Sequence, residues 1–443
     1  MSTILFAGRP SMGHLKPLRA IARQMRAEGH TAVFAGFAPP DIQREFAEDG
    51  FVFMSLPPAP STKRFKFLPS LTGYMETFMS VELFFSGLVH YAREIGKVLD
   101  QVRPQAVVAD FLFPSAFLAA EAREIPYALI YHGSLCYSGE GVPPFGSGLP
   151  IGCSPGKKEA SYRQLADSLE RMVERSLTNA RRELRLPTPG GGIPYLAAPA
   201  SPWLTLILTA ECLESPRSDI PITAFYTGPC IAETTPSVES FPIEILSTSR
   251  RIVYASLGLV DNDKPAVFMK IIRAFADRKH QLVVSAGDAY EKLSKRNLPS
   301  NVLLFKKVHQ RSLLPRVDVV ITHGGNNTVN EALFEGKPLL VLPTTGEQGD
   351  NASRVEYLGA GLRADIRGVT AHGIRALVNT LIEKPSFGRR AHAISKSLEK
   401  TAGAATASRF IAHLARTGKP IVRPHGYPLT VMKDMPPPWE FSA

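Results

Sequence analysis

The sequence has few cysteines and no long apolar run. Its 443 residues include only 4 cysteines, Cys136, Cys153, Cys212 and Cys230. Because they form no CxxC pair, we expect reduced thiols. No apolar run reaches the roughly 18 residues that a membrane-spanning helix needs, and the stretch MSTILFAGRPSMGH has no basic segment ahead of its short apolar run. These absences argue against a secreted or membrane-spanning protein and predict a cytoplasmic one.

The charged residues leave an excess of positive charge but form no nucleic-acid-binding motif. There are 51 Lys and Arg residues against 40 Asp and Glu residues, which gives a formal net charge of +11. The basic residues are scattered, and no RNP, zinc-finger or basic-zipper pattern accompanies them. We therefore expect no nucleic-acid partner. The charge instead favours an acidic small molecule such as a diphosphate, and it permits peripheral contact with an anionic membrane surface.

Short apolar runs and amphipathic helical patterns alternate along both halves of the chain. The first half begins with ILFAG, the helical pattern LKPLRAIARQMRAEG and then TAVFAG, and AVVADF and YALIYH follow later. Continuous apolar runs of this kind are typical of parallel strands whose two faces are covered by helices. The second half repeats the alternation with RIVYASLG, QLVVSAG, NVLLF, VDVVITHGG and PLLVLP. The pattern predicts an α/β protein with two Rossmann-like domains.

A polar stretch between the two halves marks the predicted domain boundary. Chains of this length ordinarily divide into more than one domain. We expect a cleft between the domains at the carboxyl ends of the strands, because ligands bind there in doubly wound sheets. The predicted segments are a first domain over 1–231, a linker over 232–249, a second domain over 250–416 and a Pro-rich tail over 417–443.

The strongest functional pattern is the transition from VDVVIT into a helix that begins near residue 325. Gly324 and Gly325 let backbone N–H groups approach an anion at the helix N-terminus, where the helix dipole favours negative charge. Asn327 and Thr328 add side-chain donors in the first turn. Glu331 lies about one turn further on the same side, where it can accept hydrogen bonds from ribose hydroxyls. A plain strand-to-helix turn, with glycine for its geometry and Asn or Thr as caps, is the alternative.

This stretch resembles the donor-binding signature of the UDP-glycosyltransferase superfamily, family 1, in its bacterial natural-product group. The family's VPQ element reads Val308-His309-Gln310 here, its THxGxNSxxE element reads THGGNNTVNE over 322–331, and Pro343 and Glu347-Gln348 follow. The chain differs from the usual form at His309, which is commonly proline, and at Lys307, which is often aromatic. The resemblance implies the GT-B fold, in which two Rossmann-like domains face one another across an interdomain cleft.

The same resemblance implies a set of donor-binding residues. His323 would contact the diphosphate, Glu331 would bind the ribose, and Glu347 and Gln348 would bind the sugar. The full implied set, with the further phosphate and base contacts, is Ser256, Val308, Gln310, His323, Gly325, Asn327, Thr328, Glu331, Glu347 and Gln348. A UDP-sugar is then the co-substrate, and no metal ion or other cofactor is expected.

A second pattern, Gly13-His14-Leu15-Lys16-Pro17, follows the first predicted strand. It looks like the family's GHxxP element, in which the histidine is the catalytic base. Asp110 ends the AVVAD run at the same edge of the predicted sheet, where the family has the aspartate partner of that base. A carboxylate beside an imidazole fixes its tautomer and stabilises the imidazolium that forms on proton transfer. The alternatives are a histidine without a role at a helix terminus and an aspartate that caps the helix after Phe113.

The resemblance therefore implies an inverting UDP-dependent hexosyltransferase, in which His14, assisted by Asp110, takes the proton of the acceptor hydroxyl. UDP-glucose is the expected donor, since Gln348 occupies a position often associated with glucose. Aromatic residues are frequent in the insertions of the first half, which favours a small, hydroxylated, apolar acceptor, with core packing as the alternative. The acceptor-binding candidates are Phe78, Phe85, Phe111, Phe113, Tyr131 and Tyr137.

Two further motifs have simpler explanations than the sites they resemble. Asp261-Asn262-Asp263 has the form of a DxD metal site, but it follows a predicted strand-end loop and indicates a polar turn. Gly190-Gly191-Gly192 lies among prolines and follows no predicted strand, so we expect a loop and not a dinucleotide fingerprint.

Three alternative functions fit two α/β domains. A nucleotide-sugar 2-epimerase-type isomerase would change the donor without any acceptor. A non-catalytic nucleotide-sugar-binding protein would bind the donor without turnover, although His14 and Asp110 argue against it. A transferase with a lipid-linked acceptor would act at a membrane surface, which the positive charge permits.

Overall fold

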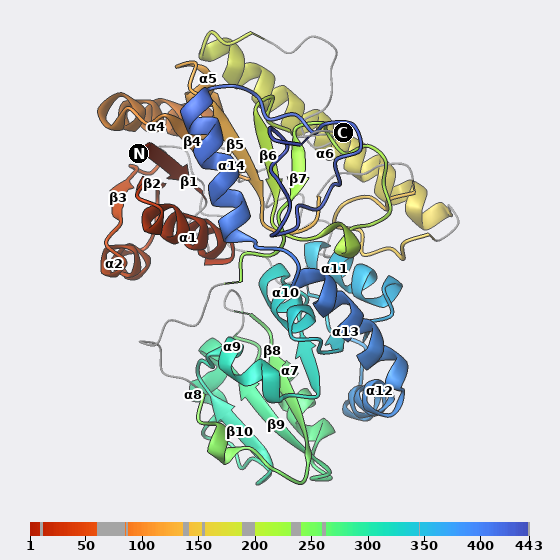
Figure 1. The fold of residues 1–443 in the computed structure, drawn as a ribbon. Helices are drawn as coiled ribbons and strands as arrows, with labels where there is room; N and C mark the ends of the chain where they lie inside the picture. The colour runs from red at the N-terminus through yellow and green to blue at the C-terminus, as the bar shows by residue number, and fades with distance from the viewer. Residues whose placement is uncertain are drawn as a thin grey trace. The chain divides into compact units, whose positions relative to one another are not determined.

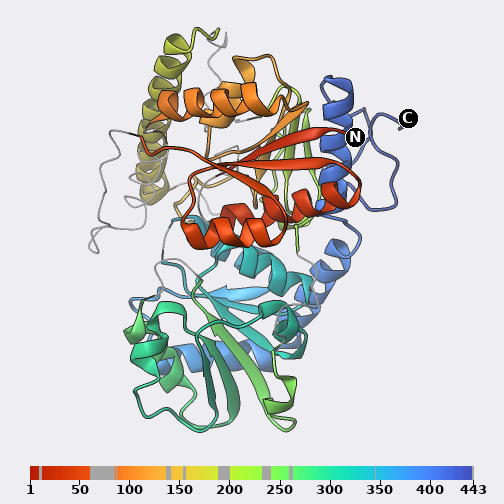
Figure 2. The same ribbon diagram turned by 90° about the vertical axis from the view of Figure 1, so that its left-hand side faces the viewer.

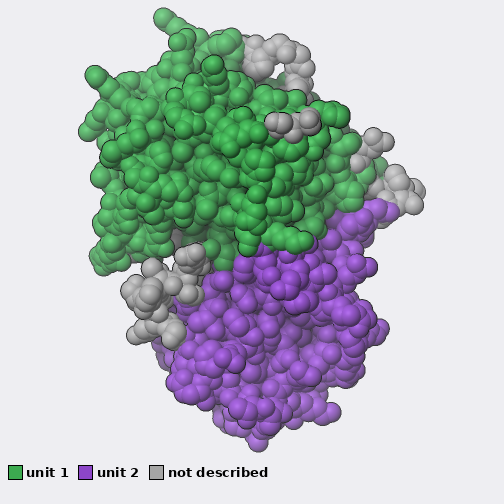
Figure 3. All heavy atoms as spheres, in the orientation of Figure 1, with its two compact units in different colours: residues 1–145, 154–232, 400–443 green, residues 146–153, 233–399 purple. Residues whose placement is uncertain are grey.

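A computed structural model shows the fold of the chain and divides it into two compact units (Figure 3). Unit 1 comprises Met1–Phe145, Ser154–Ala232 and Lys400–Ala443, and unit 2 comprises Gly146–Cys153 and Glu233–Glu399. The residues that the structure describes are 1–8, 12–59, 85, 87–135, 141–152, 156–187, 200–231, 241–258, 263–344 and 346–441.

The described residues of unit 1 form a parallel sheet of seven strands in the order β3-β2-β1-β4-β5-β6-β7 (Figure 1). The strands are β1 Thr3–Ala7, β2 Thr31–Gly36, β3 Val52–Ser55, β4 Ala106–Asp110, β5 Tyr127–Tyr131, β6 Leu204–Ile207 and β7 Ala224–Tyr226. The helices are α1 Met12–Ala27, α2 Pro40–Glu48, α4 Leu88–Val102, α5 Ser115–Glu121, α6 Lys157–Glu183 and α14 Ala404–Thr417, with a 3-10 turn at Glu211–Leu213.

Helices cover both faces of this sheet, as its continuous apolar strands require. Successive strand residues point to opposite faces, so Phe6 and Val108 pack in one core with α1, α2 and α14, whereas Leu5 and Val107 pack in another with α4, α5 and α6. Figure 1 shows α14 beside α1 on the first of these faces. The described helices include none that is both long and apolar enough to cross a membrane.

The described residues of unit 2 form a second parallel sheet of six strands in the order β10-β9-β8-β11-β12-β13 (Figure 2). The strands are β8 Arg251–Ser256, β9 His280–Ser285, β10 Val302–Phe305, β11 Val319–Thr322, β12 Leu339–Val341 and β13 Gly361–Arg363. The helices are α7 Pro265–Ala274, α8 Tyr290–Leu293, α9 Gln310–Leu313, α10 Asn326–Phe334, α11 Gly346–Tyr357, α12 Ala371–Glu383 and α13 Pro385–Leu398, with 3-10 turns at Ile243–Ile245, Gly287–Ala289 and Leu314–Arg316.

The predicted C-terminal boundary of the second domain is wrong. The end of the predicted second domain contains two helices, of which only α13 belongs to unit 2, whereas α14 belongs to unit 1. The reason is the apolar face of α14, whose Phe410 is fully buried against Phe225 of β7 with ring centroids 5.0 Å apart. Trp439 of the predicted tail packs on Phe410 as well, so the tail is part of the same core.

A short segment of the predicted first domain also belongs to unit 2. Residues 146–152 lie against α11, where the Gly146 and Gly148 N–H groups donate to the Asp350 carboxylate over 2.6 and 2.9 Å. The Leu149 carbonyl accepts a bond from the Ser353 hydroxyl over 2.7 Å. These bonds satisfy buried backbone groups of the segment, so the continuous range 1–231 is not a single structural unit.

Candidate active site

The two predicted catalytic residues lie at the topological switch point of the first sheet. β1 and β4 are neighbours, although β2 and β3 come between them in the chain. Ligands of doubly wound sheets bind outside the carboxyl ends of the strands at such a point. Asp110 is the last residue of β4, and His14 is in the first turn of the helix that follows β1. That helix begins at Met12, ahead of the predicted start at Leu15.

His14 and Asp110 are directly hydrogen-bonded. The Nδ1 atom of His14 lies 2.7 Å from Oδ2 of Asp110, whose side chain is fully buried, while 18% of the His14 side chain is exposed. The other oxygen, Oδ1, accepts a bond from the Leu112 N–H over 2.9 Å. Asp110 is not the cap of the next helix, because α5 begins at Ser115 after Pro114 and its N-terminus has no side-chain cap.

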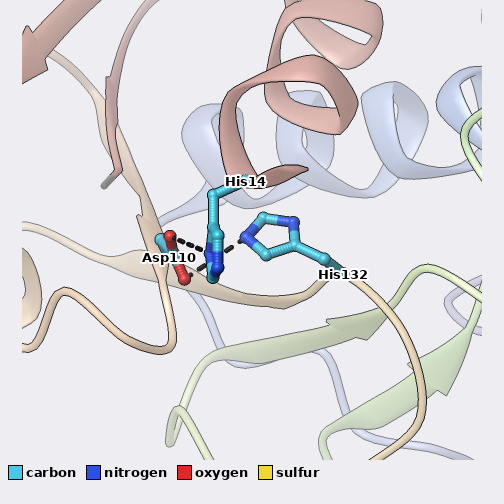
Figure 4. A group of neighbouring side chains, drawn as sticks. All are labelled: His14, Asp110 and His132. Atoms are coloured by element: carbon cyan, nitrogen blue, oxygen red, sulfur yellow. Dashed lines mark hydrogen bonds and ion pairs between the residues drawn. The ribbon is translucent and has the colours of Figure 1, made fainter. Parts of the chain in front are cut away.

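A second imidazole, which the sequence reasoning missed, approaches the same carboxylate (Figure 4). His132 follows β5, and its Nε2 atom lies 3.2 Å from Oδ1 of Asp110. The His14 and His132 rings meet edge to face, with centroids 4.7 Å apart. Burial alone would raise the pKa of Asp110, but the two imidazoles hold that pKa well below its usual range. The place of His132, directly after a buried strand adjacent to β4, is the signal that would have indicated it.

In the described part of the chain, these three residues also form a cluster of His and Asp side chains that are close enough together to hold a metal ion. Their candidate ligand atoms lie within 4.8 Å of one another. The hydrogen bond between His14 and Asp110 already joins the facing atoms, however, so a metal ion there would have to replace it. Of the DxD lookalike, Asp263 pairs with Lys292 over 2.5 Å, and Asp261 and Asn262 lie outside the described residues.

The predicted donor-binding residues gather at the switch point of the second sheet. β8 and β11 are neighbours, and their last residues, Ser256 and Thr322, pair in register. His323 to Gly325 follow Thr322 and lead into α10. Thr322 is also in register with Val341, the end of β12, after which α11 carries Glu347 and Gln348 in its first turn. The sheet register therefore places the segments that carry the sequence motif next to one another at the ends of neighbouring strands.

Glycine is needed at two positions against the His323 ring and at Gly324 beside it in the chain. A Cβ atom on Gly325, or on Gly258 after β8, would lie 2.7 Å from the Nε2 atom of His323. Gly258 and Gly324 also have positive φ angles of 88° and 95°, which L side chains rarely adopt. At Gly324 a Cβ would lie 2.9 Å from the Gln348 carbonyl oxygen. The glycines thus hold the His323 ring at the beginning of α10.

The His323 imidazole is neutral at neutral pH. Burial, helped by the Lys264 ammonium, lowers its pKa to about 4. A buried neutral imidazole can donate one hydrogen bond and accept another, but it carries no charge. His323 is therefore suited to bind by hydrogen bonding.

Hydrogen bonds connect several of the other predicted donor-site residues. The Tyr254 hydroxyl donates to Oε1 of Gln310 over 3.3 Å, and Nε2 of Gln310 donates to Oε2 of Glu331 over 2.8 Å. Nδ2 of Asn326 donates to Oε1 of Glu347 over 2.6 Å. These bonds fix the orientation of both carboxylates. Ser256, Val308 and Thr328 are buried, and Gly325 is the residue before α10.

Gln348 and Asn351 stabilise the loop between β12 and α11 and the loop before α10. Oε1 of Gln348 accepts bonds from the N–H and the hydroxyl of Thr344 over 2.9 and 2.8 Å. Nδ2 of Asn351, which no motif indicated, donates to the Gly324 carbonyl over 2.8 Å. Because its oxygen is engaged, Gln348 would contact a sugar hydroxyl through its Nε2 group.

The described acceptor-binding candidates are buried in the hydrophobic core of unit 1. Phe85, Phe111, Phe113 and Tyr131 all belong to the core on the α4 and α5 face. Phe111 stacks on Tyr131 with ring centroids 4.5 Å apart, and its ring lies 6.4 Å from that of His132. Packing accounts for these four residues in the structure. Phe78 and Tyr137 lie outside the described residues, as do Gly190 to Gly192.

Comparison with known proteins gives the same class of enzyme. Residues 194–400 match the model of the family described as UDP-glucoronosyl and UDP-glucosyl transferase. The chain is 28% identical to 4'-demethylrebeccamycin synthase of Lentzea aerocolonigenes, over 88% of this chain and 93% of that protein. It is 25% identical to zeaxanthin glucosyltransferase of Pantoea ananas, over 96% of this chain and 99% of that protein. The crystal structure of the calicheamicin glycosyltransferase CalG4 superposes with a TM-score of 0.74, at 20% identity, over 94% of this chain and 99% of that one.

Two doubly wound parallel sheets, each with functional side chains at its switch point, define the GT-B class of fold, and the structural comparison agrees. The family match over 194–400 and the similarity to two curated glycosyltransferases over most of their length together indicate a glycosyltransferase of the UDP-glycosyltransferase type.

Proposed function

We propose that the protein transfers glucose from UDP-glucose to a hydroxyl of an apolar small molecule, with inversion at the anomeric carbon. The observation that supports this most directly is the 2.7 Å hydrogen bond between Nδ1 of His14 and Oδ2 of Asp110. When Nδ1 carries a hydrogen and donates a hydrogen bond to the carboxylate, Nε2 of the same ring has a free lone pair. That lone pair takes the acceptor hydroxyl proton, and the hydroxyl oxygen forms a bond to the anomeric carbon. The bond from that carbon to the diphosphate breaks, and UDP leaves with its electron pair.

Asp110 assists this step without exchanging a proton itself. The carboxylate stays ionised because its pKa is held well below the usual range. It fixes the His14 tautomer and stabilises the imidazolium that forms in the transition state. Its burial strengthens this interaction, because the surroundings have a lower dielectric constant than water. Since the nucleophile attacks from the face opposite the leaving group, an α-linked donor gives a β-glycoside.

The second unit supplies the donor site in this proposal. The neutral His323 donates to the diphosphate, with Ser256, Asn327 and Thr328 as further phosphate contacts. The N–H groups at the start of α10, after Gly325, add favourable potential, so charge stabilisation needs no metal ion. Val308 and Gln310 lie on the base side, Glu331 binds ribose, and Glu347 and Gln348 bind the sugar.

Three observations bear on the donor sugar, the acceptor and the location. The similarity to a zeaxanthin glucosyltransferase supports glucose and an apolar acceptor. Phe111, whose ring lies 6.4 Å from that of His132, is buried and supports the wall behind the proposed site without reaching an acceptor itself. The formal charge of +11 is compatible with peripheral membrane contact of a cytoplasmic enzyme, which would suit poorly soluble acceptors.

A mass-spectrometric screen tests the proposal as a whole. Several nucleotide sugars, including UDP-glucose and dTDP-glucose, are incubated with a mixed panel of hydroxylated natural products. A product heavier than its acceptor by one hexose supports transfer, and competitive calorimetry of UDP and dTDP assigns the nucleotide. Conversion of the donor sugar without any acceptor would instead support the isomerase, and donor binding without product across a broad panel would support the binding protein.

A further inference from the structure

We propose that His132 is a positioning residue of the transfer reaction, which holds Asp110 through its second oxygen and competes with His14 for the stabilising charge of that one carboxylate. The proposal rests on the assignment of His14 as the base. Its geometric support is the arrangement in Figure 4, in which one imidazole approaches each carboxylate oxygen from a different part of the fold. No sequence motif indicates His132.

The site of His132 is built to keep this side chain in place. Only 5% of the side chain is exposed. The segment that follows it is held by Glu214, whose Oε2 accepts a bond from the Leu135 N–H over 2.8 Å, and the Ser134 hydroxyl reaches the Leu213 carbonyl at 3.5 Å. Glu214 is itself buried. Burial of a carboxylate costs free energy unless hydrogen bonds compensate it. The bonds that Glu214 accepts from the backbone do so, and they fix the position of the loop that carries His132.

The arrangement couples the protonation of the two rings. Asp110 is one negative charge, and each imidazole beside it is favoured in the charged form by that charge. With ring centroids 4.7 Å apart, a proton on either ring opposes a proton on the other. His132 and His14 therefore compete for the stabilising charge of Asp110.

Other charged groups near the cluster have partners of their own. On α1, Arg19 is paired with Glu45 and Asp49, and Lys16 is exposed. Glu214 is bound to the backbone, as described above. Among the described residues, the charged groups that affect the pKa of Asp110 are His14 and His132.

Exchange of the imidazole C2 hydrogen for deuterium, followed by peptide mass spectrometry, measures the coupling in the protein alone. The exchange rate of each histidine changes with its protonation, so its pH midpoint can be read residue by residue. In His132→Phe and in His132→Gln the midpoint of His14 should rise by about one pH unit, the scale at which neighbouring groups titrate together. Gln keeps a neutral donor near Oδ1, and Phe keeps the ring shape. His280 of unit 2, bonded to Asn379, should keep its midpoint and serves as the internal control.

The two variants separate charge competition from simple packing. If His132 only filled space or only donated a hydrogen bond, His132→Gln would leave the His14 midpoint in place. A midpoint unchanged within about 0.3 pH units in both variants, with a wild-type circular dichroism spectrum and thermal transition as signs of folding, would overturn the proposal. The assay requires no acceptor and no turnover, so this failure would leave the base assignment of His14 standing. That assignment is tested separately by replacing His14.

Discussion

The two histidines of the proposed site predict opposite kinetic effects on substitution. His14→Ala removes the group that takes the acceptor proton, whereas His323→Ala removes a hydrogen bond to the bound diphosphate. A lost general base usually lowers kcat by roughly 10²- to 10⁴-fold. We therefore expect kcat to fall at least about 10²-fold in His14→Ala, with UDP affinity close to that of the wild type.

For His323→Ala the expected loss is in binding. A hydrogen bond to a charged group contributes about 1.5–3 kcal/mol, which corresponds to roughly 10- to 150-fold in Kd. Because burial and Lys264 lower the pKa of His323 to about 4, no ion pair adds to this figure. Asp110→Asn should be milder than His14→Ala, since the imidazole remains and only its orienting charge is lost.

Calorimetry with UDP and turnover with the best acceptor from the screen measure both effects. His372→Ala is the matched control, because this histidine is exposed in the first turn of α12 and lies in neither site. It should leave both quantities unchanged. Wild-type turnover of an alcohol acceptor by His14→Ala would refute the base assignment, and unchanged UDP affinity in His323→Ala would refute the diphosphate contact.

Three further predictions concern the metal, the glycines and acid stability. Chelation with EDTA should leave the rate unchanged, and loss of activity that Mn²⁺ restores would mean that Asp263 must leave Lys292 to bind a metal ion. Gly325→Ala places a Cβ 2.7 Å from Nε2 of His323 and should weaken UDP binding about tenfold, whereas the control Gly388→Ala, with open space around it, should not. The pKa of His323 is about 4 in the folded protein, below its ordinary value of 6.5, so the unfolded chain binds more protons between these values and stability falls on acidification. At pH 5 the loss of folding free energy amounts to about 2 kcal/mol. His323→Gln should therefore lose less Tm than the wild type between pH 7 and pH 5, and an equal loss would contradict the lowered pKa.

The alternation of apolar runs and helical patterns was enough to predict both parallel sheets, because strands buried on two faces leave a continuous apolar signal. The predicted runs around AVVADF and YALIYH are β4 and β5. The strands β6, β7 and β13 were missed. β7 and β13 lie in no long apolar run, unlike the equally short β12, which lies in PLLVLP. The predicted end of the second domain at residue 416 was wrong for a different reason. Whether α14 packs on one sheet or another depends on tertiary complementarity at Phe410 and Phe225, which local patterns do not contain.

The site was predictable where spacing along the chain reflects strand ends. The motif over 322–331 and the pair Glu347-Gln348 follow neighbouring strands, so sequence order translates into adjacency. His132 follows a strand in the same way, but a single histidine after an apolar run is no signal without its neighbours. The bonds of Asp350 to Gly146 and Gly148 were beyond reach, because they join residues about 200 positions apart through backbone N–H groups.

The surroundings of His14 and His323 give the same side chain two different chemistries. His14 lies against a buried carboxylate, which stabilises a positive charge that forms on the ring during the proposed proton transfer. His323 is buried beside Gly258 and Gly325, and both its burial and the Lys264 ammonium oppose a positive charge on its ring. The first environment suits a group whose charge changes during the reaction, and the second suits a group that must stay neutral while it donates.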